Sequence, residues 1–143
     1  MKEESRAAHL CLLDPESVLG FVVEPQAIRR PKAPDAHYNH VQVAAFAKRL
    51  RDKGVSVQIG AHGQREGLAA HWEMWMMAQG GMAPIDALRT ATINPARSLG
   101  LDRELGSIEP GKLADLVVLD RNPLENIRNT DSVSYVMLNG RLY

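Results

Sequence analysis

The feature that most constrains this fold is a helical pattern joined to a strand pattern by a single glycine. Residues 39–53 place apolar side chains at helical spacing, with Asn39 as a good N-terminal cap and Gly54 as a natural stop. Residues 55–61, VSVQIGA, then alternate apolar and polar side chains, as a β-strand does. A helix that turns directly into a strand is the compact step of an alternating α/β fold. We therefore expect an α/β protein.

The size and charge of the chain narrow its class further. With 143 residues, of which 45% are hydrophobic and 24% charged, it is long enough to bury a core and too apolar to be disordered. Its 17 basic and 17 acidic residues balance, so no net charge draws it to nucleic acid or to a membrane. No apolar run reaches the roughly 20 residues of a membrane span. We therefore expect no nucleic-acid partner, no membrane partner and, because no targeting signal is visible, a cytoplasmic location by default.

Two helical patterns follow the predicted strand. Residues 64–79 carry apolar side chains on most sides, with Glu73 as the one ionised residue of the interior, so this helix should be covered on most sides. The GGM run at 80–82 breaks the pattern. Pro84 opens the next helix, and Asn94 renews it as a last short piece.

The last third of the chain changes to a β pattern. A Pro-Gly pair at 110–111 suits a type II turn, and residues 114–119 are predicted to be a strand. Residues 133–143 indicate a hairpin around the Asn-Gly pair at 139–140. The second arm of this hairpin holds only three residues, which suggests a sequence that is cut short.

The first 40 residues carry weaker patterns. Residues 14–16 resemble the start of a helix, whereas VLGFVVE at 18–24 is closer to a short strand. Residues 25–40 hold three prolines and no repeating apolar pattern, which predicts a loop. A loop of this length is usually either functional or a linker.

The histidines are the first candidates for metal or proton chemistry: His9, His37, His40, His62 and His71. No HxH, HExxH or CxxC motif occurs among them. His37 and His40 are three residues apart and could meet on one helical turn, although a structural or capping role is favoured at a loop-to-helix junction. His71 borders the apolar stripe of its helix and is expected to be packed and hydrogen-bonded. Glu73 either pairs with a distant base or serves a site.

His62 stands apart because it directly follows the predicted strand 55–61. Its neighbours Gly60, Ala61 and Gly63 are small and would let a backbone or a ligand approach closely. In parallel α/β architectures, the carboxyl ends of strands are where sites are built. The alternative is a strand that stops at a turn, where the histidine has no function. A phosphate-binding glycine loop is disfavoured because the GxGxxG and GxxxxGK spacings are missing.

Residues 80–124, GGMAPIDALRTATINPARSLGLDRELGSIEPGKLADLVVLDRNPL, carry a family resemblance. They resemble the C-terminal signature of metal-dependent amidohydrolases, the superfamily that includes imidazolonepropionase and prolidase-like enzymes. The likeness extends from about Gly54 to Leu142, and its PGK and ADLVVLD blocks are specific together. The GAHGQ and HWE stretches further resemble a subgroup that is fused to TolB-like propellers.

This resemblance implies an α/β fold, namely the C-terminal portion of a (β/α)8 TIM barrel plus part of a small β-sandwich. Residues 1–105 would supply the last barrel strands and helices, with 55–61 as the eighth strand, and residues 106–143 the last strands of the sandwich. It implies hydrolysis of carbon–nitrogen bonds other than peptide bonds, in a small amide or cyclic amide substrate. A divalent metal, zinc in the usual case, would activate the water.

The resemblance also assigns candidate site residues. A residue that ends the last barrel strand commonly binds metal and shuttles the proton, which implies a catalytic and metal-binding role for His62. His40 is a weaker candidate for a metal ligand. Arg30 and His37, together with Arg29, are candidate substrate contacts on the loop at 25–40, and a solvated loop is the alternative.

The chain departs from the family pattern in two ways. The HxH of the first barrel strand and the ligands of the middle strands are not present. At the last barrel strand the family has Gly-Thr-Asp or Gly-Ser-Asp, whereas this chain has Gly60-Ala61-His62, with histidine in place of the aspartate. A neutral imidazole can still bind metal or accept a proton. We therefore expect a C-terminal piece that is inactive alone and pairs with the N-terminal remainder of the barrel or with a second copy. The alternative is a non-catalytic interaction or oligomerisation module derived from the same fold.

Overall fold

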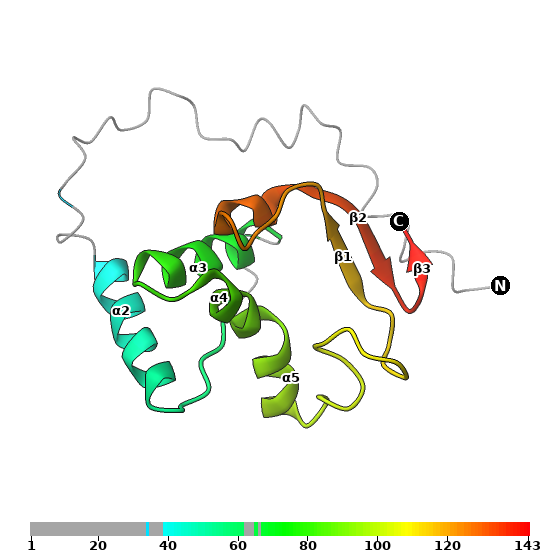
Figure 1. Cartoon of the computed structure of the whole chain (residues 1–143), viewed down its shortest axis with the longest axis horizontal. Coiled ribbons are helices and arrows are strands. Elements are labelled where there is room, and N and C mark those ends of the chain that lie inside the picture. Colours follow the sequence, from blue (N-terminus) through cyan, green and yellow to red (C-terminus); the bar gives the residue numbers. More distant parts are fainter. Residues whose placement is uncertain (1–33, 35–38, 62–64, 66) are drawn as a thin grey trace. The chain divides into compact units, whose positions relative to one another are not determined.

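The computed structural model describes four stretches of the chain: Pro34, residues 39–61, Arg65 and residues 67–143 (Figure 1). The chain divides into two units, residues 1–33 and 34–143, and all described residues belong to the second unit. The predictions made for the first unit, for the loop before residue 39 and for His62 lie outside the described residues.

Within the described ranges, helices come first and a small sheet follows (Figure 1). The helices are α2 (Asn39–Asp52), α3 (Leu68–Gln79), α4 (Pro84–Ala91) and α5 (Ile93–Leu99). They are followed by β1 (Leu116–Leu119), the 3-10 helix η2 (Ile127–Asp131), β2 (Val133–Leu138) and β3 (Arg141–Leu142). The predicted helices and hairpin strands are confirmed, with α3 shorter at its start than the pattern indicated. None of the helices in these ranges has the length and apolar character that crossing a bilayer requires.

Helix α2 ends at the glycine that the sequence indicated. The amide of Gly54 donates to the carbonyl of Arg51 at 2.9 Å, and the amide of Val55 donates to the carbonyl of Leu50 at 3.0 Å. Gly54 has φ 83, which lies in the left-handed region that glycine enters without a Cβ penalty. The chain therefore leaves α2 through a sharp turn and runs directly into residues 55–61.

A very close backbone approach joins α2 to the end of α3. Ala44 is the buried residue of α2, and Gly80 is the C-cap of α3. A Cβ atom on Gly80 would stand 2.5 Å from the amide nitrogen of Ala45 and 2.6 Å from the Cβ of Ala44. These distances are shorter than any van der Waals contact, so the two helices can meet in this way only at a glycine.

The apolar core forms around α3, α4 and η2. Its buried members are Met74, Met82, Ala87 and Ile127. Partly buried apolar side chains pack against them: Val57, Ile59, Trp75, Met77, Ala78, Leu88 and Ala91. The three methionines of this cluster fill an irregular space, which suits a flexible unbranched side chain.

Residues 55–61 form no strand, which corrects the prediction made from their alternation. The alternation itself is present, because Val57 and Ile59 pack against the core whereas Gln58 and Gly60 are exposed. A strand also needs a neighbouring strand, and among the described residues the partners of this segment are helices. The pattern therefore predicted correctly that Val57 and Ile59 face inward, was wrong for Val55, which is 49% exposed, and failed on the hydrogen bonding.

The sheet has the order β1-β2-β3 and is antiparallel throughout. Asn139 and Gly140 connect β2 to β3 with φ 50 and φ 76, the pair of positive values that a type I′ turn needs. Before β1, the amide of Lys112 donates to the carbonyl of Glu109 at 3.2 Å across the predicted Pro-Gly turn, where Gly111 has φ 91. Both predicted turns are confirmed.

The indole of Trp75 joins α3 to the 3-10 helix η2, which sequence reasoning missed. The Trp75 Nε1 donates to the carbonyl oxygen of Ile127 at 3.1 Å and to the Oγ1 of Thr130 at 2.9 Å. The guanidinium of Arg128 lies 5.0 Å from the Trp75 ring centroid. Asn126 caps η2 by accepting the amide of Arg128 at 3.0 Å. Segments about 50 residues apart are thus connected through one side chain.

Candidate functional site

Segment 55–61, which leads to the predicted site residue His62, is held by side chains and backbone of the helices around it. The Nδ2 of Asn94 donates to the carbonyl of Val57 at 2.9 Å. The amide of Ile59 donates to the carbonyl of Thr90, the last buried residue of α4, at 3.1 Å. The Nε2 of Gln58 donates to the Oγ of Ser98 on α5. The middle of the segment, residues 57–59, is therefore oriented without a sheet.

The carboxyl end of the segment has an anchor of its own. The amide of Gly60 donates to the Oε2 of Glu73 on α3 at 2.6 Å, which is short for a bond from an amide to an oxygen and typical of a charge-assisted one. Of the two roles left open for Glu73, pairing with a distant base does not occur among the described residues. Its carboxylate binds the backbone instead.

The structure brings few of the predicted site residues together. His62, His37 and Arg30 lie outside the described residues. His40 is on the first turn of α2 and its Nε2 lies 3.2 Å from the Oε1 of Gln79 at the end of α3. The described part of the chain contains no group of three or more His, Cys, Asp or Glu residues that could hold a metal ion. By themselves these residues do not fit a metal centre.

His71 is packed as predicted, but one of its nitrogens has no partner. Its ring centroid lies 6.4 Å from that of Trp75, with an interplanar angle of 36°. The Nδ1 of His71 is buried and has no hydrogen-bond partner in the described part of the chain. The predicted hydrogen bonding is therefore not found for this atom among the described residues.

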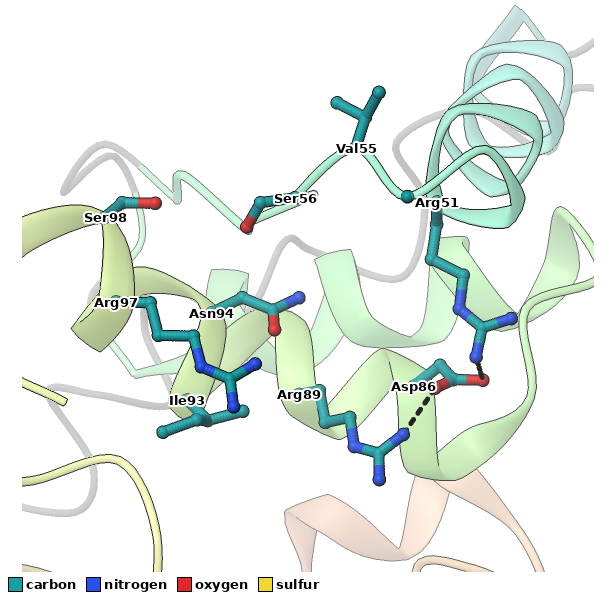
Figure 2. Close-up of a pocket in the computed structure, with 10 residues that line it drawn as sticks. Arg51, Val55, Ser56, Asp86, Arg89, Ile93, Asn94, Arg97 and Ser98 are labelled. Atoms are coloured by element: carbon teal, nitrogen blue, oxygen red, sulfur yellow. Dashed lines mark hydrogen bonds and ion pairs between the residues drawn. The ribbon is translucent and has the colours of Figure 1, made fainter.

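A pocket of about 490 Å³ lies at the other end of segment 55–61 (Figure 2). It is lined by residues of three helices and of the segment: Arg51, Gly54, Val55, Ser56, Asp86, Arg89, Ile93, Asn94, Arg97 and Ser98. The Nη1 of Arg89 lies 3.0 Å from the Oδ1 of Asp86, and the Nη2 of Arg51 pairs with the Oδ2. The hydrogen bond to Asp86, with a second one to Asp52, raises the pKa of the Arg51 guanidinium above its usual value.

In the barrel that the resemblance implies, this pocket would lie at the amino ends of the strands, away from the catalytic centre. Gly54 precedes the segment and Val55 and Ser56 begin it, whereas residue 62 follows its carboxyl end. In barrel enzymes the carboxyl ends carry the chemistry, and the amino ends contribute to stability. The Asp86 side chain is only 9% exposed and has a guanidinium on either side (Figure 2), so we assign this ion-pair cluster to the joining of α2 and α4.

Replacement of Asp86 by asparagine tests that assignment. The variant leaves the guanidiniums of Arg51 and Arg89 without their shared carboxylate, and we expect the free energy of unfolding to fall by about 1–3 kcal/mol. Urea denaturation in low and high salt measures it, and the loss should shrink in high salt. Asp52→Asn is the matched control, since its carboxylate is exposed, and it should leave stability unchanged. An equal loss in both variants would contradict a special role for Asp86.

The comparisons with known proteins agree with this architecture. Residues 5–143 match the sequence model of the amidohydrolase family. A 5-methylthioadenosine/S-adenosylhomocysteine deaminase of Teredinibacter turnerae is 37% identical over 91 residues, 53% of this chain and 20% of that protein. An ochratoxinase of Aspergillus niger is 32% identical over 113 residues, 76% of this chain and 22% of that protein. The crystal structure of a Xaa-Pro dipeptidase with bound methionine matches with a TM-score of 0.65 and 35% identity, over 71% of this chain and 25% of that one.

The chain belongs to the amidohydrolase family. Its structural neighbours are amidohydrolase TIM-barrel proteins, and its described residues form a mixed α/β fragment with a small antiparallel sheet. The chain spans only 20% to 25% of the length of these relatives. The resemblance to propeller-fused amidohydrolases and the domain boundary at 105/106 stay predictions.

Proposed function

We propose that this chain supplies the C-terminal part of a metal-dependent hydrolase that cleaves carbon–nitrogen bonds other than peptide bonds in small amides or cyclic amides. The observation that carries the proposal is the family match over residues 5–143. The relatives support the cleavage of a carbon–nitrogen bond, and the deaminase supports one that is not a peptide bond, whereas the dipeptidase breaks a peptide bond. Since one structural relative is a dipeptidase, a proline dipeptide belongs among the substrates to be assayed.

The metal centre that we propose belongs to the whole protein and not to the described residues alone. The described residues hold no three-ligand group, so the ligands of the zinc ion that we propose would come from elsewhere in the protein. His62 is the residue of this chain that we propose as one of them or as the proton-transferring base. A histidine suits either role, because its unperturbed pKa of about 6.5 leaves a neutral nitrogen available near neutral pH.

The described residues have a supporting role in this proposal. Hydrogen bonds from three helices orient segment 55–61, with Asn94 at Val57, Thr90 at Ile59 and Glu73 at Gly60. Side chains that act on a substrate must be held within a fraction of an ångström, and rigid neighbours achieve that better than a loop does. The helices after the segment therefore supply the frame and residue 62 supplies the reactive group.

Complementation tests the proposal. The chain is produced alone and together with the N-terminal part of a homologous amidohydrolase, and both samples are assayed for zinc content and for hydrolysis of an Xaa-Pro dipeptide, an N-acyl amino acid and a hydantoin. We expect neither stoichiometric zinc nor turnover from the chain alone, and both from the complemented protein. In that protein, His62→Ala should lower kcat by about 100-fold or more.

His40→Ala is the control for this experiment. His40 contacts Gln79 at the helix ends, so its loss should change stability more than turnover. Full activity of the complemented His62→Ala variant would refute the role of His62. Tight zinc binding by the chain alone would refute the view that its ligands come from elsewhere.

A second candidate function is a non-catalytic interaction or oligomerisation module. It is favoured by large apolar side chains that are exposed on helices and sheet alike, among them Phe46 at 51%, Val117 at 58% and Tyr135 at 53%. Apolar surface of this kind marks an interface that another chain covers. Light scattering decides between the candidates: a monodisperse oligomer of the chain, with no rescue of turnover by any N-terminal part, would favour the module.

A further inference from the structure

The pocket at the start of segment 55–61 carries more positive than negative charge. Three arginines and one aspartate line it, which leaves a formal surplus of two positive charges. Both oxygens of the buried Asp86 are already paired, the Oδ1 with Arg89 at 3.0 Å and the Oδ2 with Arg51. The surplus therefore belongs to the guanidinium of Arg97 and to those donors of the other two arginines that Asp86 does not use.

Arg97 lines this pocket with a charge that the described residues leave unpaired. Within the described part of the chain, its side chain forms no hydrogen bond, ion pair or ring contact. It extends from α5 toward Asn94 and Arg89 (Figure 2). A guanidinium presents five N–H donors in a planar fork, which matches the oxygens of a phosphate or a carboxylate. Arg97 therefore offers unused donors to an anion in the pocket.

Neutral groups complete the lining of the pocket. The Oγ of Ser98 accepts a hydrogen bond from Gln58, so the hydroxyl keeps its own proton to donate. Ser56 adds a second hydroxyl, and Val55 and Ile93 add apolar surface. The volume of about 490 Å³ lies in the range of small-molecule sites and is larger than a bare anion requires. This lining suits a ligand that has an anionic group and a short carbon part.

We propose that this pocket binds the phosphate group of a small organic phosphate, with Arg97 and Arg89 as the guanidiniums that hold it. A phosphate monoester carries about −1.5 to −2 charge near neutral pH, which matches the surplus of two, whereas a single carboxylate matches half of it. The ligand would connect α4 and α5 with the start of the segment and so stabilise the folded chain. The inference goes beyond the proposed hydrolase, because none of the candidate catalytic residues lines the pocket.

Titration of the whole chain with glycerol phosphate tests this inference without any assay of turnover. Calorimetry should show saturable binding of one equivalent, and the midpoint of thermal unfolding should rise with the ligand. Arg97→Ala should weaken the affinity by about 10-fold or more, and Arg97→Lys should recover part of it, because it keeps the charge and loses the fork. Arg103→Ala is the matched control: it removes an exposed arginine just beyond α5 that does not line the pocket, and it should leave the affinity unchanged.

Two further titrations, at the same ionic strength, separate the sources of the anion. Inorganic phosphate should bind more weakly than the ester, because it leaves the apolar lining of Val55 and Ile93 uncovered, and malonate should compete poorly with the ester. Equal weakening by Arg97→Ala and Arg103→Ala would reveal a general attraction to positive charge and overturn the inference. The absence of saturable binding by the wild type would overturn it as well. Inorganic phosphate or malonate that binds as tightly as the ester would overturn the assignment to an organic phosphate.

Discussion

Replacement of Gly80 by alanine should destabilise the protein by about 3 kcal/mol, near the upper end for overpacking. The added methyl group would stand 2.5 Å from the amide nitrogen of Ala45 and 2.6 Å from the Cβ of Ala44. Backbone atoms of a helix cannot move aside as the end of a flexible side chain can. Helices α2 and α3 must therefore separate, which opens the buried contact at Ala44. Chemical denaturation of the purified variant measures the loss.

Gly60→Ala is the matched control for this experiment. A Cβ at Gly60 would meet nothing within 4 Å, and neither glycine has a positive φ, so both substitutions add the same atoms without backbone strain. Gly60 also keeps its amide, so its bond to Glu73 survives. We expect unchanged stability within about 0.5 kcal/mol for this control. Similar losses at Gly60 and Gly80 would show that the close approach of the two helices is not what makes Gly80 necessary.

Replacement of Trp75 by alanine should cost about 3–5 kcal/mol. The indole packs against the core cluster and donates to Ile127 and Thr130, which lie 52 and 55 residues further along the chain. Its loss removes the packing, the two hydrogen bonds and the contact with Arg128 at once. Trp75→Phe should lose less, because it keeps an aromatic ring and gives up the donor and part of the packed volume. Near-ultraviolet circular dichroism during denaturation follows both variants.

Trp72 provides the control on the same helix. It is three residues earlier and 39% exposed, and its contact is the guanidinium of Arg65 at 5.7 Å from the ring centroid. An exposed ring over an arginine contributes on the order of 0.5–1 kcal/mol. Trp72→Ala should therefore cost far less than Trp75→Ala. If the order were reversed, η2 would not be held by the indole, and the connection between helices and sheet would have to lie elsewhere.

Local patterns predicted most of the secondary structure of the described residues. Capping and stop signals located α2 between Asn39 and Gly54, and an Asn-Gly pair predicted the hairpin between β2 and β3. These signals act within a few residues, so neighbouring residues are enough to produce them. The strand prediction for residues 55–61 failed because a strand depends on a segment that is distant in sequence. Alternation selects which side chains face inward, whereas a strand also requires a second chain segment at hydrogen-bonding distance.

The candidate site was predictable only in part. The position after residue 61 was predicted because small residues and a histidine follow an alternating run, and it stays a prediction because it lies outside the described residues. The roles of Glu73 and Asp86 could not be found in this way. Each carboxylate binds a group that is distant in sequence, the Gly60 amide and the Arg51 guanidinium respectively. No local pattern encodes a partner that the fold alone brings close.

The sequence by itself determined the family, the helices from α2 to α5 and the turns of the sheet, because motifs and capping residues act through neighbours along the chain. The tertiary structure decided what each polar residue does. It joined Glu73 to the backbone before residue 62, surrounded Asp86 with guanidiniums and brought η2 under Trp75. The physical reason is that hydrogen bonds and ion pairs depend on distances of about 3 Å, which are set only when segments far apart in the chain pack together.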